Sequence, residues 1–387
     1  MESIVYITKL IVYGLLICLS GLILVDSFVR SVVSDSRIDW QRRIGQTFSR
    51  SLVIAIIVAL FAQLIQWSQS FGGGEQLISL LVEGSTGRTW LLLLPLSVLY
   101  LFVQKLPTAR LIIVALLLLA ESMNGHASTS SLIILFDFVH LVTISIWIGG
   151  VIYFLVNWKD GGEHARAFLE QFTKLLWLTI ALASVSGLAL TATIVPSISY
   201  LLYTSWGQLL LVKVAAVLLA IWLGYKAKTF IKRNASGGKP SVLKTEFITL
   251  MIVIALAALI SSLSPTPNAV NSLNYHQMGD ELHYTVKLTP NAPGPNTFSL
   301  SLWTLQEEGE IANVQLSIYA NDKPRTSARD FTLQPITTDD NIEFPGFNER
   351  RFGLEELKLP YPTTWRATVD IIFESGQQRQ FTFTFKN

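Results

Sequence analysis

The first two thirds of the chain alternate between long apolar runs and short polar connections. A run of roughly 20 apolar residues suffices to cross the hydrocarbon core of a bilayer as a helix. We therefore predict an all-α polytopic bundle with about eight transmembrane helices, because about eight runs approach or reach that length. The predicted spans cover residues 4–29, 51–68, 89–104, 108–126, 132–156, 171–195, 206–230 and 247–264.

The pattern changes after Pro265 and Pro267. Residues 268–387 are polar and alternate with a period of two, which is typical of strands with one buried face. Turn residues separate seven candidate strands, at 282–288, 297–303, 312–319, 329–334, 351–358, 365–373 and 379–385. Short strands at such intervals predict an immunoglobulin-like β-sandwich. The chain thus divides into a membrane domain, 1–267, and a β-sandwich domain, 268–387.

Composition supports an integral membrane protein. Of the 387 residues 51% are hydrophobic and 14% are charged, whereas about 25% are charged in a typical soluble domain. The lone Cys18 excludes an internal disulfide, a cysteine-rich zinc site and an iron–sulfur cluster. The sequence contains no Walker A loop, Rossmann glycine pattern, nucleophile elbow or HExxH helix. We therefore expect no enzymatic activity, no ATP-driven pumping and no nucleic-acid partner.

Basic residues concentrate in the connections after the first, third, fifth and seventh spans, for example Arg42, Arg43, Lys228 and Lys232. Cytoplasmic loops carry such an excess of Lys and Arg. We therefore expect a multi-pass protein of the cytoplasmic membrane, in contact with the lipid bilayer. Both termini and the β-sandwich are expected outside the cytoplasm.

The stretch from Glu121 to Gly150 carries the candidate chemistry. Asp137 and His140 lie inside an apolar run and, three residues apart, share one helix face with Trp147 two turns further on. An ionisable group in a span costs roughly 2.5–3.5 kcal/mol on insertion scales, so its presence points to a partner and a function. His126, just before this run, is expected near the same membrane surface.

Met123, His126, Asp137 and His140 form the candidate metal site. Imidazole suits copper and zinc, and a thioether favours Cu(I). Asp137 would either bind the metal or orient His140. The spacing alone does not identify the metal, because two histidines at similar depth would also suit haem, and each could simply hydrogen-bond within the bundle.

Three further groups surround this site in the prediction. Glu121 is a candidate for an outer or gating charge, and Trp147 for an aromatic wall. Lys213, about two turns into the seventh span, is expected to snorkel outward or to pair with Glu121 or Asp137.

A second candidate cluster comprises His276, Met278 and His283, at the entrance to the β-domain. If the chain is extended there, His276 and Met278 share one face. These residue types suit capture of copper outside the membrane, although ordinary surface residues would give the same pattern.

Several motifs resemble the CopD copper-resistance membrane proteins. They are Gly125-His126-Ala127, then His140-Leu followed by Trp147-Ile-Gly149-Gly150, Ser186-Gly187, Trp206 to Lys213, and Glu246. The resemblance covers about residues 1–267 and is closest to YcnJ-like fusions, without the N-terminal CopC domain that precedes the membrane part there. The tail, with Pro290-x-x-Pro-Gly294-x-Asn296 and Leu359-Pro360 before Trp365, is similar to small β-domains of the YtkA or FixH-like type.

This resemblance implies copper handling at the cytoplasmic membrane: transport, most often described as uptake, together with homeostasis and resistance. The cargo would be Cu(I) or Cu(II), delivered by a CopC-like extracytoplasmic protein or by the C-terminal domain. Two alternatives stay open. One is a haem-binding redox protein with His126 and His140 as axial ligands. The other is a membrane-anchored factor that delivers copper to a secreted protein.

Overall fold

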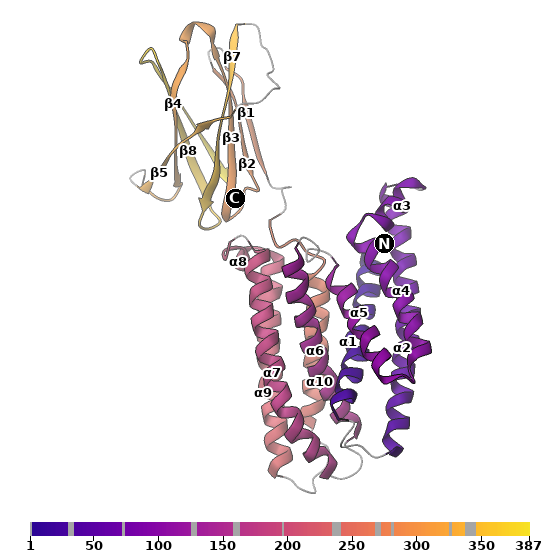
Figure 1. The fold of residues 1–387 in the computed structure, drawn as a ribbon. Coiled ribbons are helices and arrows are strands. Elements are labelled where there is room, and N and C mark those ends of the chain that lie inside the picture. The colour runs from indigo at the N-terminus through magenta and orange to yellow at the C-terminus, as the bar shows by residue number, and fades with distance from the viewer. Residues whose placement is uncertain are drawn as a thin grey trace. The chain divides into compact units, whose positions relative to one another are not determined.

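The computed structural model describes residues 2–29, 35–71, 74–124, 130–157, 163–195, 197–233, 241–267, 272–279, 282–324, 327–336 and 346–387. The chain forms two compact units (Figure 1). The helical unit comprises Met1–Ile194 and Gln208–Leu263, and the sandwich unit comprises Val195–Gly207 and Ser264–Asn387.

Long apolar helices dominate the helical unit. Its elements are α1 (Glu2–Val29), α2 (Asp35–Phe71), α3 (Glu75–Val82), α4 (Ser85–Val103), α5 (Pro107–Ser122), α6 (Ser131–Asn157), α7 (Glu163–Ile194), α9 (Ser205–Arg233) and α10 (Ser241–Ile260). Within the described ranges, seven helices are long and apolar enough to cross a membrane. The polytopic helical bundle expected from the sequence is confirmed.

The difference from about eight spans lies at α5. This helix begins with Pro107 in its first turn and has 16 residues, a length of about 24 Å. The predicted span 108–126 extends past Ser122, where the helix ends. The last six residues of that span, Glu121 to His126, are mostly polar, so the prediction overstated the length of this helix.

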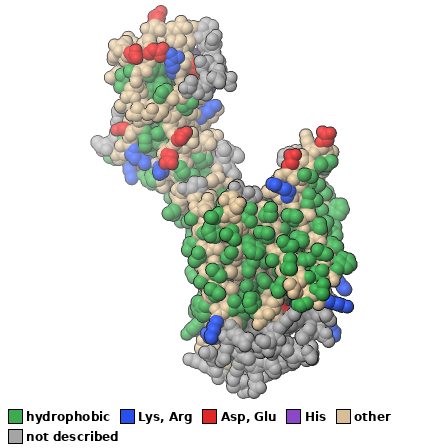
Figure 2. Space-filling view, viewed as in Figure 1, with side chains coloured by type: hydrophobic (Ala, Val, Ile, Leu, Met, Phe, Trp, Pro, Cys, Tyr) green, Lys and Arg blue, Asp and Glu red, His purple; other side chains and the backbone are tan. Residues whose placement is uncertain are grey.

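Hydrophobic side chains cover the face of the helical unit that Figure 2 displays. Large exposed residues include Phe61 on α2, Val185 and Leu188 on α7, and Leu218 on α9. In a water-soluble protein an apolar surface of this extent would require a covering partner. Together with the seven membrane-length helices, it indicates a multi-pass membrane protein.

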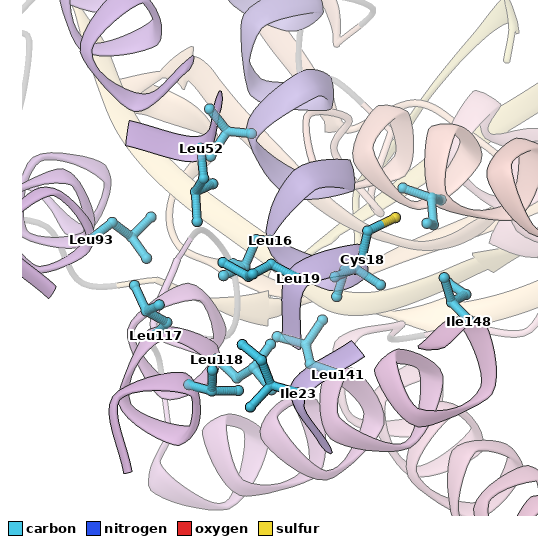
Figure 3. Packing of buried hydrophobic residues seen from close by; sticks show 14 of the residues in the cluster. Leu16, Cys18, Leu19, Ile23, Leu52, Leu93, Leu117, Leu118, Leu141 and Ile148 are labelled. Atoms are coloured by element: carbon cyan, nitrogen blue, oxygen red, sulfur yellow. The ribbon is translucent and has the colours of Figure 1, made fainter. Parts of the chain in front are cut away.

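Aliphatic side chains from α1, α2, α4, α5 and α6 fill the centre of the helical unit (Figure 3). Leu16 and Leu19 of α1 are almost completely buried, as are Leu117 of α5 and Leu141 of α6. Cys18 is a buried free thiol in the same cluster. Helix α1 therefore lies centrally and connects the helices on either side.

Glycines bring α1 and α6 into backbone contact. A Cβ atom on Gly21 would collide with the Ser145 carbonyl oxygen and would lie 2.8 Å from the Gly149 nitrogen. A Cβ atom on Gly149 would lie 2.7 Å from the Gly21 Cα atom. Small residues permit such close approach of membrane helices. Gly149 of the Trp147-Ile-Gly149-Gly150 motif therefore packs against Gly21.

The sandwich unit consists of two antiparallel sheets, which confirms the predicted β-sandwich. One sheet has the strand order β1-β2-β3-β7-β6 and the other β5-β4-β8-β9. The strands are β1 (Leu273–Gln277), β2 (Leu282–Thr289), β3 (Gly294–Leu305), β4 (Ile311–Ala320), β5 (Arg329–Thr332), β6 (Gln334–Pro335), β7 (Phe347–Leu359), β8 (Thr364–Phe373) and β9 (Gln378–Lys386).

Two strands were not among the seven expected. The sequence 329–334 contains β5 and the start of the two-residue β6, which pairs with β7 in the other sheet. The additional strand β1 pairs with β2 and contains His276. Alternating apolar residues of β3, β4 and β8 form the core between the sheets, including Leu300, Leu316 and Val369.

Asn296 holds the Pro- and Gly-rich turn at the beginning of β3 through side-chain hydrogen bonds. Its amide nitrogen donates to the carbonyl oxygens of Ala292 and Gly294, at 2.8 and 2.9 Å, and its Oδ1 accepts from the Ala292 nitrogen. In the same unit the short helix α8 (Tyr200–Tyr203) presents Tyr200, whose hydroxyl donates to the Pro295 carbonyl oxygen at 3.2 Å.

A substitution of Gly21 should destabilise the protein. We expect Gly21→Ala to cost roughly 1–3 kcal/mol of folding free energy, because the added methyl overpacks the α1–α6 contact. Gly14→Ala is the matched control on the same helix, since its Cβ atom would meet only Ile254 at an ordinary 3.9 Å. Thermal unfolding in detergent measures the difference. Equal melting temperatures for the two variants would contradict the close-contact assignment.

Candidate functional site

Asp137 and His140 both lie on α6, half-buried within the helical unit. Met123 caps the C-terminal end of α5 and is 37% exposed. His126 lies outside the described residues, so its proximity to His140 stays a prediction. Two of the four predicted metal ligands, Asp137 and His140, therefore lie on the same helix. Whether all four lie together stays a prediction.

His140 is held by α7. Its Nδ1 lies 3.0 Å from the Ala183 carbonyl oxygen and 3.1 Å from Ser186 Oγ. A carbonyl oxygen can only accept, and the Ser186 hydroxyl already donates to the Leu182 carbonyl at 2.7 Å. This network assigns the proton to Nδ1, which donates to Ala183.

The assigned tautomer leaves the lone pair on Nε2. A histidine that donates one ring nitrogen to a backbone carbonyl presents the other as a metal ligand in a fixed orientation. Gly187 makes room for the ring, because a Cβ atom there would lie 3.2 Å from His140 Cε1. Ser186 and Gly187 thus contact the imidazole ring and leave room for it. The sequence analysis had not assigned them this role.

Charged groups from three other helices surround α6. Lys213 of α9 is close enough for its charge to interact with Asp137 and His140. Among the expectations for Lys213, this charge interaction favours Asp137 as its neighbour, and direct pairing stays a prediction. Glu121 of α5 interacts with Asp137 and also with Lys9 of α1. Sequence reasoning missed Lys9, although a lysine inside the first apolar run was the available signal.

Further along α6, Trp147 contacts a buried carboxyl group of α10. Trp147 Nε1 donates to Glu246 Oε1 of α10 at 3.3 Å, and the two residues are 4% and 3% exposed. A Cβ atom on Gly224 of α9 would lie 2.9 Å from Glu246 Oε1. Trp147 was predicted to form an aromatic wall. Its indole N–H also donates to Glu246, whose buried carboxyl group would lack this hydrogen bond without it.

The described ranges contain no group of three or more His, Cys, Asp or Glu residues positioned to hold a metal ion. A metal at His140 would then draw on Asp137 and on a ligand of another type or from outside these ranges. Met123 and His126 are the candidates that the sequence supplies.

The second predicted cluster lies on one face of the sandwich unit. His276 pairs across strands with Thr285, and its Nδ1 lies 2.8 Å from Thr285 Oγ1. The pairing of β1 with β2 ends with Gln277 opposite Tyr284, and one further step in the same register puts Met278, just after the strand, opposite His283. Residues opposite each other share a face, and alternate residues do too. His276, Met278 and His283 are therefore on the same side of the sheet.

The opposite face of these strands points into the core. The Tyr284 hydroxyl donates to Gln277 Oε1 at 2.6 Å, and its ring stacks on Phe381. Burial, with a smaller effect of Tyr275, raises the pKa of Tyr284 to about 12. This phenol is therefore neutral at physiological pH and is no metal ligand. Met278 is 66% exposed, and the His283 ring packs edge-on against Phe347.

Two comparisons with known proteins show similarity to copper-related proteins. Residues 166–263 match the family model described as Copper resistance protein D, CopD. This part of the helical unit is therefore similar to CopD proteins. The match spans α9, α10 and most of α7, and so contains Ser186, Lys213 and Glu246, which contact or approach α6.

The chain is also similar to the copper transport protein CutJ of Bacillus subtilis (strain 168). The two are 28% identical over 301 residues, which are 69% of this chain and 55% of CutJ. The chain thus spans about half the length of this curated relative. No solved structure matches the chain. The CopD resemblance is confirmed, and the two comparisons support a copper-related membrane protein.

Removing the indole N–H at Trp147 should destabilise the helical unit. We expect Trp147→Phe to cost roughly 1–3 kcal/mol, because Glu246 loses a buried hydrogen-bond donor. Trp177→Phe is the control, since Trp177 on α7 is 54% exposed. Thermal unfolding of the full chain in detergent compares them. A Trp147→Phe variant as stable as Trp177→Phe would show that the Glu246 contact contributes nothing.

Proposed function

We propose that the protein transports copper across the cytoplasmic membrane, in the direction of uptake, and thereby contributes to copper homeostasis and resistance. The observation that carries this proposal is His140. It is a histidine inside a membrane helix, with Nδ1 committed to the Ala183 carbonyl and Nε2 left as a lone-pair donor. The CopD segment beside it and the similarity to CutJ support copper as the cargo.

In this proposal His140 and Asp137 bind the ion, with His126 and Met123 completing the ligand set. Lys213 supplies a positive charge that balances Asp137 when copper is absent. Arrival of copper weakens the need for this pairing, so the lysine can act as a gate. Binding of this kind must be favourable enough to admit the ion and weak enough to release it.

The proposed orientation places this site near the outer face and both termini outside the cytoplasm, with the basic connections inside. The protein catalyses no chemical reaction in this proposal. Copper moves down its own gradient or is coupled to another gradient. A CopC-like extracytoplasmic protein would deliver the ion, or the sandwich unit would capture it.

Copper capture by the sandwich unit is supported by the strand register. The same-face arrangement of His276, Met278 and His283 offers two imidazoles and a thioether, a ligand set suited to Cu(I). His276 Nδ1 lies 2.8 Å from Thr285 Oγ1, and in the tautomer with the proton on Nδ1 the other ring nitrogen would bind an ion.

Purified protein should contain copper that depends on the membrane histidines. We expect His140→Ala and the double variant His126→Ala with His140→Ala to lose the copper bound in the helical unit, because each removes a nitrogen ligand, and to keep any copper bound by the sandwich unit. Ser184→Ala, whose hydroxyl bonds only the Ile180 carbonyl on the exposed side of α7, is the control and should keep its copper. Elemental analysis with an absorption spectrum measures this.

Copper unchanged in the double variant would overturn the proposed site. A haem absorption band that disappears with the histidines would overturn the transport proposal and favour the redox alternative.

The capture surface predicts a second, separable copper signal. Met278→Leu with His283→Ala should weaken external Cu(I) binding roughly tenfold or more, since two of three ligands are removed. Lys287→Gln, an exposed substitution on the same strand, should not. Competition for Cu(I) against a coloured chelator gives both affinities. If the two variants bound Cu(I) with the same affinity, the three residues of the cluster would be ordinary surface residues and not copper ligands.

A further inference from the structure

Helix α3 is a short helix between two helices that are long enough to cross a membrane. It follows α2, which ends at Phe71, and precedes α4, which begins at Ser85. Its eight residues span about 12 Å, far less than the roughly 30 Å of the hydrocarbon core of a bilayer. Because α2 ends and α4 begins beside it in the chain, α3 belongs at one surface of the membrane, at the end of the helical unit where Figure 1 draws it.

One side of α3 packs against the helical unit. Leu77, Leu80 and Leu81 are half-buried and recur at the spacing of a single helix face. The last turn of α3 approaches α4 closely at Gly87, where a Cβ atom would lie 2.5 Å from the Leu81 Cα atom. This contact fixes the C-terminal turn of α3 at the level of the first turn of α4.

A second side of α3 is apolar and exposed. Ile78 and Val82, one turn apart on the helix, are 63% and 57% exposed. On α4, Leu91 and Leu92 lie about one turn beyond Gly87 and are also exposed. The exposed apolar surface of a membrane-length helix therefore begins within about one turn of the place where α3 touches it.

The third side of α3 is polar and acidic. Glu75, Gln76, Ser79 and Glu83 are exposed, and Ser79 Oγ donates to Glu83 Oε2 at 2.9 Å. At about 100° per residue, these four positions gather on the side away from the half-buried leucines. Many interfacial helices carry Lys or Arg on this side and are drawn to anionic lipids. Helix α3 has neither residue, so burial of apolar surface is the attraction that it offers to a bilayer.

We propose that α3 is an interfacial helix that inserts Ile78 and Val82 into the edge of the hydrocarbon core and keeps its acidic side among the lipid headgroups. The acyl chains that cover the exposed side of α4 would then also cover these two residues. The anchored helix would hold the first turn of α4 at the membrane surface, where Thr86 Oγ1 donates to Asn124 Oδ1 beyond the end of α5 at 3.4 Å. Such an anchor does not depend on whether the protein transports copper.

Nitroxide labels on the two sides of α3 should report different surroundings. The full chain is reconstituted in phosphatidylcholine vesicles after Cys18→Ala removes the native thiol. Ile78→Cys and Val82→Cys carry the label on the apolar side, and Gln76→Cys and Ser79→Cys are the matched controls on the polar side. Electron paramagnetic resonance then measures how often each label meets oxygen, which concentrates in lipid, and a nickel chelate, which stays in water.

We expect the ratio of oxygen to chelate accessibility to be roughly threefold or more higher on the apolar side, because acyl chains exclude the chelate. Phe61→Cys on α2, where the native side chain is 62% exposed, calibrates the ratio for lipid contact. The ratios on α3 should stay the same when about a third of the lipid is replaced by anionic phosphatidylglycerol, because α3 carries no positive charge.

Equal ratios on the two sides of α3, with the Phe61→Cys label still in lipid, would place the helix in water and overturn the anchor. Low access to both reagents at Ile78→Cys and Val82→Cys, with a motionally restricted spectrum, would show a protein partner on this side and would also overturn it. A ratio that rose with phosphatidylglycerol would overturn apolar burial as the cause of insertion.

Discussion

The backbone contact between Gly21 and Gly149 is the constraint on which the helical unit depends. Each glycine occupies space that a Cβ atom of the other would need, so α1 and α6 approach more closely than side chains would allow. Helix α6 carries Asp137, His140 and Trp147, and α1 carries Lys9 and Tyr13. The contact therefore sets the distance between the helix with the candidate copper ligands and the helix with Lys9 and Tyr13. It also lets α6 reach α7 and α10 on its other sides, where Ala183 and Glu246 hold its polar side chains.

Several polar groups within these helices have partners on another helix. His140 donates to α7, Trp147 donates to Glu246 of α10, and Lys213 of α9 interacts with Asp137. At the other end of α1, Asp26 pairs with Arg110 of α5 at 2.8 Å. Removing one partner of such a pair leaves an uncompensated group in an apolar setting. These pairs thus orient the helices as well as carrying the candidate chemistry.

Sequence pattern alone predicted the two-part architecture, because length of apolar run and period-two alternation report directly on helix and strand. The sequence pattern did not predict where every helix and strand begins and ends. The run 108–126 continued past the end of α5, and β1 was too short and too polar to stand out until β2 paired with it. The face shared by Asp137 and His140 followed from spacing. The tautomer of His140 did not, since Ala183 is 43 residues away in the chain. The match of His126 to His140 stays a prediction.

Two lysines of the helical unit, Lys9 and Lys213, are near enough for their charges to interact with those of Glu121 and Asp137. A positive neighbour offsets part of the cost of placing a negative charge among apolar helices. Each lysine is on a flexible four-carbon stem and can move when another cation arrives. In the copper transport proposed above, an ion bound at Asp137 would replace the Lys213 charge instead of adding to it, so the local charge would change little. The contact between Gly21 and Gly149 would hold α1 and α6 together throughout.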